Sequence, residues 1–283
     1  MVKIALGTAQ FGINYGISNE KGIPNDKELK MIFTSARNHG IKYLDTHSAY
    51  GNSEERIGTL GNSFFKIVTK FSKVTSNMEL RSSLANSLKR LNADFIYGFL
   101  AHDPNSLISA PSLWHELLEL KRSGKIKKIG YSLYSPEQLE KLMELGCIPE
   151  IVQLPYSLLD RKFEGYLPLL KEHNTEIHVR SVFLQGLYLM NPSSLPKKLS
   201  SLKESLTILQ KLCKNEKKSV AEIALNFVRV NPYIDQLVIG VESAQQLNEN
   251  IDLISKQISS PEFFVKLDSI NVKDKLLLNP SNW

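Results

Sequence analysis

Short apolar runs alternate with longer amphipathic segments along the whole chain. The short runs carry β-branched or aromatic residues and are apolar at most positions, as expected of parallel strands that are covered on both faces. We therefore expect eight buried strands, namely Lys3–Leu6, Tyr43–Asp45, Phe65–Thr69, Phe95–Leu100, Ile126–Gly130, Ile151–Leu154, Glu176–Val179 and Gln236–Ile239.

The segments between these runs carry the signals of helices. Three of them begin with a capping box, in which a serine is followed three residues later by Glu or Gln: Ser135–Gln138, Ser219–Glu222 and Ser243–Gln246. Apolar residues then recur at helical spacing, for example Leu139, Leu142 and Met143 after the first box. We expect a helix after each of these caps.

Eight strand–helix units without a break in composition predict an α/β protein with one closed (β/α)8 TIM barrel, formed by residues 1–283 as a single domain. An open dinucleotide-binding sheet would need G-x-G-x-x-G after the first strand, and Gly7–Gly12 reads GTAQFG. Met190–Ser201 is rich in Pro and Ser and predicts a loop over the barrel mouth. The tail 271–283, which ends in Trp283, is expected either to fold over this mouth or to pack on the outside.

The composition is that of a soluble globular protein, with 42% apolar and 23% charged residues. No segment approaches the ~20 apolar residues of a membrane span, and Met1–Gly7 lacks the apolar core of a signal peptide. We therefore expect a cytoplasmic protein without membrane association. The net charge of +6 is spread along the chain, which gives no reason to expect a nucleic-acid partner. Cys147 and Cys213 lie in apolar helical contexts and are expected to be buried thiols.

Four polar residues stand at or just after the carboxyl ends of the second, third and fourth strands. They are Asp45, Tyr50, Lys70 and His102. In a barrel these strand ends meet at one mouth, so the four side chains are expected to converge there. Taken singly, each has a structural explanation, such as a helix cap for Asp45 or a packing aromatic for Tyr50.

Together the four residues make a unit that can transfer a proton. A lysine ammonium beside a phenol favours phenolate and lowers the pKa of the tyrosine. A carboxylate keeps the lysine charged, and a histidine at the same mouth can bind a carbonyl oxygen. This predicts general-acid assistance to hydride transfer from a reduced nicotinamide.

Four separated motifs resemble those of the aldo-keto reductases. Leu44–Glu54 reads LDTHSAYGNSE and is similar to the family signature Asp-Thr-Ala-x-x-Tyr-Gly-x-Ser-Glu, and Val68–Lys70 is similar to its Thr-Lys strand end. Leu100–Pro104 matches Leu-x-His-x-Pro, and Gln153–Arg161 resembles the sixth-strand segment of many bacterial members. The resemblance runs from Gly7 to about Asn250.

The resemblance implies an NAD(P)H-dependent reductase that converts an aldehyde or ketone into an alcohol. Tyr50 would be the proton donor, Lys70 its neighbour, Asp45 the partner of the lysine, and His102 the residue that orients the substrate. The implied cofactor-binding residues are Ser132 and Gln153 for the nicotinamide carboxamide, Glu249 and Asn250 for the adenine, and Gly7, Thr8, Arg180, Ser181 and Gly240. No metal is implied.

The chain departs from the family pattern at three places. Leu133 replaces an Asn after the serine of the fifth strand, and Arg180 replaces an aromatic residue that stacks on the nicotinamide ring. Arg180 would stack there through its planar guanidinium or bind an acidic group of the substrate. After the eighth strand the chain has Glu242 where the family often has a basic residue for the 2′-phosphate. NADPH is therefore expected from the resemblance, with NADH as the alternative, and Glu242 would equally serve as a helix-start residue.

The substrate is expected to be a small carbonyl compound that is polar and sugar-like, because polar residues fall at the mouth: Asn14, Tyr15, Arg180 and Gln185. Two other functions compete with the reductase. One is a nicotinamide-binding regulatory subunit without significant turnover, and the other is a phosphate-handling barrel of unrelated chemistry. The second would need a Gly-rich phosphate loop, whereas Gly186 and Gly240 are isolated. Protein partners are left open.

Overall fold

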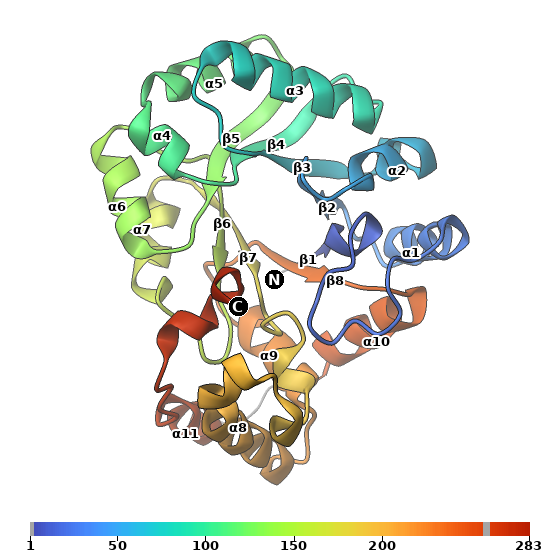
Figure 1. Ribbon diagram of the computed structural model, residues 1–283, viewed down its shortest axis with the longest axis vertical. Helices are drawn as coiled ribbons and strands as arrows, with labels where there is room; N and C mark the ends of the chain where they lie inside the picture. Colours follow the sequence, from blue (N-terminus) through green and yellow to red (C-terminus); the bar gives the residue numbers. More distant parts are fainter. Residues whose placement is uncertain (1–2, 257–260) are drawn as a thin grey trace.

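The computed structural model describes residues 3–256 and 261–283, and the ends of the predicted domain at residues 1 and 2 lie outside this range. Eight parallel strands close into a barrel in which each strand pairs with the next and β8 pairs with β1 (Figure 1). The strands are β1 Lys3–Gly7, β2 Tyr43–Asp45, β3 Lys66–Phe71, β4 Ile96–Ala101, β5 Ile126–Ser132, β6 Ile151–Pro155, β7 Glu176–Arg180 and β8 Gln236–Gly240. The predicted (β/α)8 barrel is confirmed.

Most strands extend one or two residues further toward the mouth than the apolar runs predicted. Lys70, Ser132 and Arg180 are therefore strand residues. The hydrogen-bonded ladder continues into the mouth beyond the residues at which the predicted strands end. Polar side chains at these positions are consequently held on rigid backbone.

Helices surround the barrel on its outside (Figure 1). They are α1 Asp26–Asn38, α2 Ser53–Leu60, α3 Asn77–Leu91, α4 Asn105–Ser109, α5 Ser112–Arg122, α6 Pro136–Glu144, α7 Leu167–Glu172, α8 Lys203–Asn215, α9 Val220–Arg229, α10 Ala244–Ile254 and α11 Pro261–Asp268. The predicted capping box is complete at the start of α6. Ser219 and Ser243 cap α9 and α10 by accepting from the backbone N–H three residues later, but Gln246 Oε1 accepts from Glu242 N and not from Ser243 N. None of the described helices is both long enough and apolar enough to span a membrane.

The main hydrophobic core lies between the outer face of the barrel and the helices. A smaller apolar cluster fills the barrel itself and consists of Ala5, Tyr43, Val68, Leu100 and Ile151. The barrel is therefore a packed body, and the space for a ligand is at its mouth. Cys147 and Cys213 are buried and free, as the sequence predicted.

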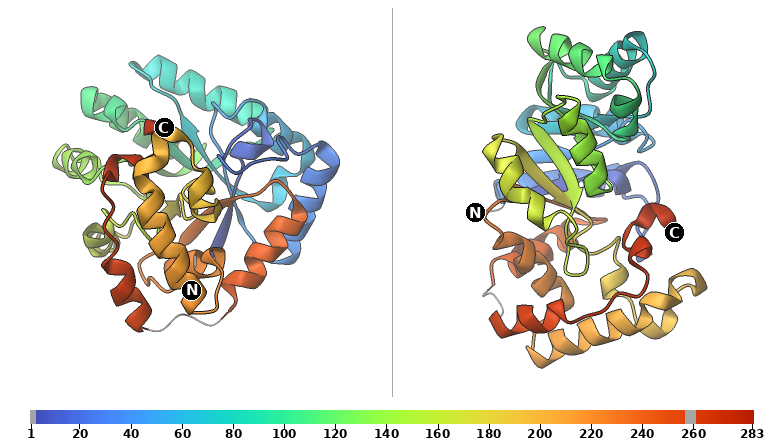
Figure 2. Two further views of the ribbon diagram at one scale, coloured as in Figure 1. Left: turned by 60° about the horizontal axis from the view of Figure 1, so that its bottom comes forward. Right: turned by 90° about the vertical axis from the view of Figure 1, so that its left-hand side faces the viewer.

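The connection after β7 and the C-terminal tail are irregular. Within the predicted loop Met190–Ser201, two 3-10 segments, Pro192–Ser194 and Lys197–Leu202, pack against α8. In the tail, Trp283 packs against the edge of the main core and its Nε1 donates to Leu277 O at 2.8 Å. The start of β1 and the last turn of the chain lie on opposite sides of the molecule (Figure 2). Closure of the tail over the mouth stays a prediction.

Candidate active site

A buried ion pair occupies the bottom of the barrel mouth. Lys70, in β3, donates from Nζ to both carboxylate oxygens of Asp45, at the end of β2, at 2.8 Å. Its third donation goes to Thr46 O at 2.9 Å, so all three ammonium protons are used. Burial lowers the pKa of Lys70, and the charge of Asp45 opposes this shift. These three hydrogen bonds hold the Lys70–Asp45 pair in one arrangement.

Asp45 also receives a bond from across the barrel. Gln153, in β6, donates from Nε2 to Asp45 Oδ2 at 2.7 Å. The family resemblance implies that Gln153 binds the nicotinamide carboxamide. In the structure its amide nitrogen is committed to Asp45, which fixes the orientation of the amide and leaves the oxygen as the group that a ligand can use.

Tyr50 lies at the end of the short turn that follows β2, and it lines the same cavity as Asp45. The centroid of its ring lies 6.4 Å from the centroid of the Tyr15 ring and 5.2 Å from that of the His47 ring. Burial, followed by the negative charge of Asp45, raises the pKa of Tyr50 well above its ordinary value. The expected net lowering of this pKa is therefore not seen, because burial is the largest cause and it raises the pKa.

His102 follows directly after β4 and belongs to a chain of aromatic contacts. Its ring stacks on that of His47, with centroids 4.2 Å apart and planes 12° apart. Its Nε2 is 3.2 Å from the hydroxyl of Tyr134. Burial first, and the charges of Lys70 and Arg180 next, lower the pKa of His102 to about 4. His102 is consequently neutral near pH 7.

His47 and Tyr134 were not singled out in the sequence. Burial lowers the pKa of His47 to about 2, with smaller contributions from the charges of His102 and Lys70. His47 lies inside the Asp-to-Tyr signature, and Tyr134 follows Ser132 by two residues. The only feature of the sequence that could have pointed to His47 and Tyr134 as site residues is their position close to a strand end. Their contacts depend on the directions of side chains in loops, which the sequence does not show.

A cavity of about 290 Å³ opens above the ion pair. Its lining brings together most of the predicted site residues: Gly7, Thr8, Asp45, Tyr50, Gln153, Arg180, Ser181, Gly240, Glu249 and Asn250. Three others lie behind or beside it, namely Lys70, His102 and Ser132. Ser132 is buried in β5 next to its strand partner Gln153. The lining also includes Gln10, in the 3-10 segment Ala9–Phe11, and Ser18 and Phe183, which lie on loops; no sequence motif marks these three residues.

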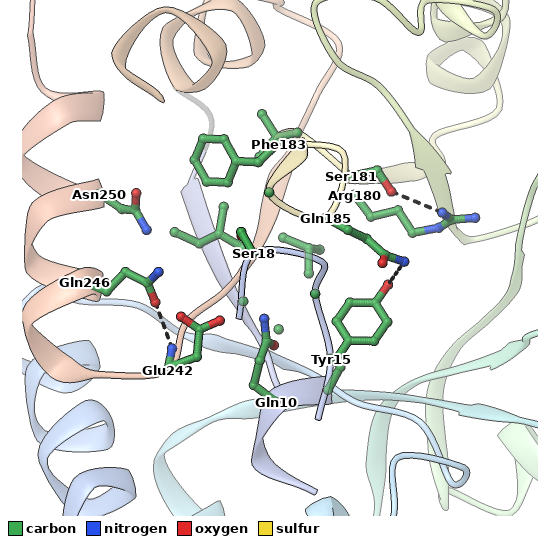
Figure 3. Close-up of a pocket in the computed structure, with 18 of the residues that line it drawn as sticks. Gln10, Tyr15, Ser18, Arg180, Ser181, Phe183, Gln185, Glu242, Gln246 and Asn250 are labelled. Carbon is green, nitrogen blue, oxygen red and sulfur yellow. Dashed lines mark hydrogen bonds between the residues drawn. The ribbon is translucent and has the colours of Figure 1, made fainter. Parts of the chain in front are cut away.

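The cavity has two chemically different ends (Figure 3). At one end are Arg180 and Tyr15, and Gln185 Nε2 donates to the Tyr15 hydroxyl at 2.9 Å. At the other end the residues come from the start of α10, where Gln246 Oε1 accepts from Glu242 N at 2.8 Å. Arg180 thus lies at the end of the cavity opposite Glu242, and Asp45, which also lines the cavity, is paired with Lys70.

The residues present fit a nicotinamide dinucleotide. A Cβ added at Gly240 would collide with the side-chain amide of Gln10, so the floor of the cavity is closed there by a polar group. Thr8 is fixed at the edge of the cavity, because its N and its Oγ1 donate to Asp45 O at 2.9 and 3.0 Å and its O accepts from Ser53 Oγ at 2.9 Å. Amide side chains stand at both ends of the cavity, Gln153 beside Asp45 and Asn250 on α10. An elongated, mixed polar and apolar cavity of this kind suits a carboxamide at one end and a base at the other.

Comparisons with known proteins agree with this geometry. The profile of the family described as "Aldo/keto reductase family" matches residues 3–272. The chain is 26% identical to "Uncharacterized oxidoreductase YqkF" of Bacillus subtilis, over 97% of this chain and 98% of that protein. It is 23% identical to the "NADH-specific methylglyoxal reductase" of Escherichia coli, over 93% of this chain and 96% of that protein. The solved structure of the glycerol dehydrogenase AKR11B4 from Gluconobacter oxydans superposes with a TM-score of 0.75 at 24% identity, over 94% of this chain and 90% of that chain.

Proposed function

This chain belongs to the aldo/keto reductase family and reduces carbonyl compounds with NAD(P)H, and from this premise we propose that Tyr50 is its proton donor. The observation that carries the proposal is that Tyr50 lines the cavity together with Asp45, whose buried carboxylate is paired with Lys70. The raised pKa keeps the phenol protonated at neutral pH, so that it holds a proton for the substrate oxygen.

Lys70 and Asp45 are proposed to act through their electrostatics. As the Tyr50 proton moves to the substrate oxygen, negative charge grows on the phenol oxygen. A fixed ammonium nearby stabilises that charge in a site with little water. The two bonds to Asp45 hold the Lys70 ammonium in place and keep it charged despite its burial.

His102 is proposed to orient the substrate carbonyl. As a neutral imidazole it carries one N–H, and it is held by the stacked ring of His47 and by the hydroxyl of Tyr134. These two contacts fix the plane of the ring, which fixes the direction of any bond that it makes to the substrate.

The cofactor supplies a hydride to the carbonyl carbon when it is bound. Gln153 and Ser132 are the residues proposed to hold its carboxamide, and Glu249 and Asn250 to contact its adenine. Family membership favours NADPH. Glu242, which lines the cavity, opposes a 2′-phosphate. We propose that the chain uses both cofactors, with a weaker preference for NADPH than a basic loop would give.

The substrate is proposed to be a polar carbonyl compound of sugar-like size, bound among Tyr15, Arg180 and Gln185. The test is to follow oxidation of NADPH and of NADH with a panel of aldehydes, ketones and keto-sugars. Turnover of polar members that disappears in Tyr50→Phe supports the proposal. Firm cofactor binding with no turnover of any panel member would instead favour a nicotinamide-binding regulatory subunit.

A further inference from the structure

Arg180 is a cation at the mouth without an anionic partner. Among the described residues that line the cavity it carries the only positive charge. Its guanidinium donates to Leu133 O at 3.0 Å and to Ser181 Oγ at 3.3 Å, which are both neutral acceptors. Within residues 3–256 and 261–283 no carboxylate forms an ion pair with it. A half-buried guanidinium of this kind is well placed to receive an anion.

The guanidinium of Arg180 is held in one orientation but does not use all of its N–H donors within the protein. Its carbon lies 4.6 Å from the centre of the Tyr134 ring, so the ring supports one face of the group. A guanidinium has five N–H donors in a fixed fork, and the two bonds to Leu133 and Ser181 leave donors for a ligand. Because the orientation is set before any ligand arrives, little side-chain entropy is lost on binding.

The orientation of the Arg180 side chain places its positive charge close to the residues that are proposed to be catalytic. Tyr134, on which the guanidinium lies, bonds to His102 through its hydroxyl. Burial is the main cause of the pKa shifts of Tyr50, Tyr15 and His102, and the charge of Arg180 acts on the pKa of each as well. The nearby Asp45 is already matched by Lys70. This end of the cavity therefore carries an uncompensated positive charge next to the proton donor.

We propose that Arg180 binds the carboxylate or phosphate of the substrate, so that the enzyme reduces an anionic aldehyde or ketone in preference to a neutral one. The proposal rests on the proposed function, since it assigns the substrate class of the same site. It also explains why Arg stands where an aromatic residue would stack on a ring, because a planar fork adds a bidentate anion contact that an aromatic ring lacks.

The first test compares matched substrates that differ by one anionic group. The pairs are glyceraldehyde 3-phosphate with glyceraldehyde, and 4-carboxybenzaldehyde with benzaldehyde. We expect kcat/KM to be higher for the anionic member of at least one pair by about 10-fold to 100-fold, as for one charge-assisted contact. Preference in only the first pair identifies a phosphate, and preference in only the second identifies a carboxylate.

Three variants distinguish a direct contact between Arg180 and the anion from a general effect of the protein's charge. Arg180→Met should bring the ratio within each pair close to one, and Arg180→Lys should keep an intermediate ratio because it retains charge without the fork. Arg122→Met is the matched control, since Arg122 is an exposed residue of α5 that pairs with Glu119. This control should leave the ratios at their wild-type values. Equal rates within both pairs for the wild-type enzyme, with neutral aldehydes turned over well, would overturn the proposal while the proposed function stands.

A binding measurement tests the anion site at Arg180 independently of the proposed reductase function. Calorimetric titration with glycerol 3-phosphate and with glycerol needs no turnover. We expect the phosphate to bind more tightly to the wild-type protein by about tenfold or more, and this difference to disappear in Arg180→Met. If the difference were seen without reduction of any aldehyde, the anion site would stand and the proposed function would fail. Equal binding of both probes to wild type and Arg180→Met contradicts the anion site directly.

Discussion

Lys70 Nζ lies 2.8 Å from each carboxylate oxygen of Asp45, and both side chains are almost wholly buried. Removing one partner of such a pair leaves a charge without compensation in the interior, which typically costs ~3–5 kcal/mol of folding free energy. The pair proposed to act in catalysis is therefore also expected to stabilise the fold, and experiments on it must measure both effects.

Lys70→Met should lose turnover to the same extent as removal of the Tyr50 hydroxyl, because the phenol oxygen loses its nearby cation. Asp45→Asn should be milder in turnover, since Asp45 acts through Lys70. Both variants should also lose unfolding free energy on the scale of a broken buried pair, ~3–5 kcal/mol. Steady-state kinetics and urea unfolding measure the two effects. Wild-type turnover in Lys70→Met would remove the lysine from the mechanism.

Tyr50→Phe should abolish nearly all turnover while the cofactor still binds. A phenyl ring preserves the shape of the side chain but carries no proton, and general acids contribute ~10²–10⁴-fold to rate. The measurement is kcat/KM with the best substrate of the panel, together with calorimetric titration of NADPH. A variant that kept more than about a tenth of the wild-type rate, well outside that range, would contradict the assignment of Tyr50.

The stacked histidines should make the protein sensitive to acid. The folded-state pKa values of His102 and His47, about 4 and about 2, lie below the ordinary value of 6.5. The folded state therefore binds fewer protons than the unfolded state, and stability falls as the pH drops below about 6.5, by up to ~1.4 kcal/mol per pH unit for each histidine.

His47→Phe keeps an aromatic ring against His102 and removes one titrating group. Urea unfolding at pH 7 and pH 5 should show a loss of free energy in the wild-type protein and a smaller loss in the variant. Equal losses in both proteins would mean that His47 is not held neutral by its burial.

The positions of the candidate catalytic residues could be predicted from the sequence because each stands at or just after the end of a buried strand, and strand ends converge in a closed barrel. The orientation of the side chains could not be predicted. Gln153 donates to Asp45 across the barrel, and Arg180 turns toward Tyr134, because packing among residues far apart in sequence decides both contacts. The direction of the Tyr50 pKa could not be predicted either, because it depends first on burial of the phenol, which the motif does not show.

The backbone conformation of the loop after β7 could not be predicted from the sequence either. Ser181, Leu184 and Gln185 all adopt positive φ, at 64°, 48° and 54°. Positive φ is uncommon for residues other than glycine, so no residue type in the sequence signals this conformation. The loop nevertheless brings Gln185 to Tyr15 and Ser181 to Arg180, and thereby shapes the substrate end of the cavity.

Glu242 provides the last prediction, which concerns the choice of cofactor. Its side chain lines the end of the cavity opposite Arg180, together with Gln246 and Asn250 (Figure 3). No cation within residues 3–256 and 261–283 pairs with it. A 2′-phosphate adds nearly two negative charges, so an unpaired carboxylate nearby weakens its binding. The wild-type preference for NADPH over NADH should therefore be modest.

Glu242→Lys replaces the repulsion with a charge-assisted contact and should shift the ratio of dissociation constants toward NADPH by about tenfold, if ~1.4 kcal/mol is gained. Calorimetric titration of both cofactors against the wild type and the variant measures the ratio. Glu172→Lys, at an exposed position of α7, makes the same change of charge away from the cavity and should leave the ratio unchanged. High salt should reduce the gain in Glu242→Lys, because the contact lies near solvent. A strong preference for NADPH in the wild type, unchanged by Glu242→Lys, would show that the carboxylate does not face the 2′ position and that another group holds the phosphate.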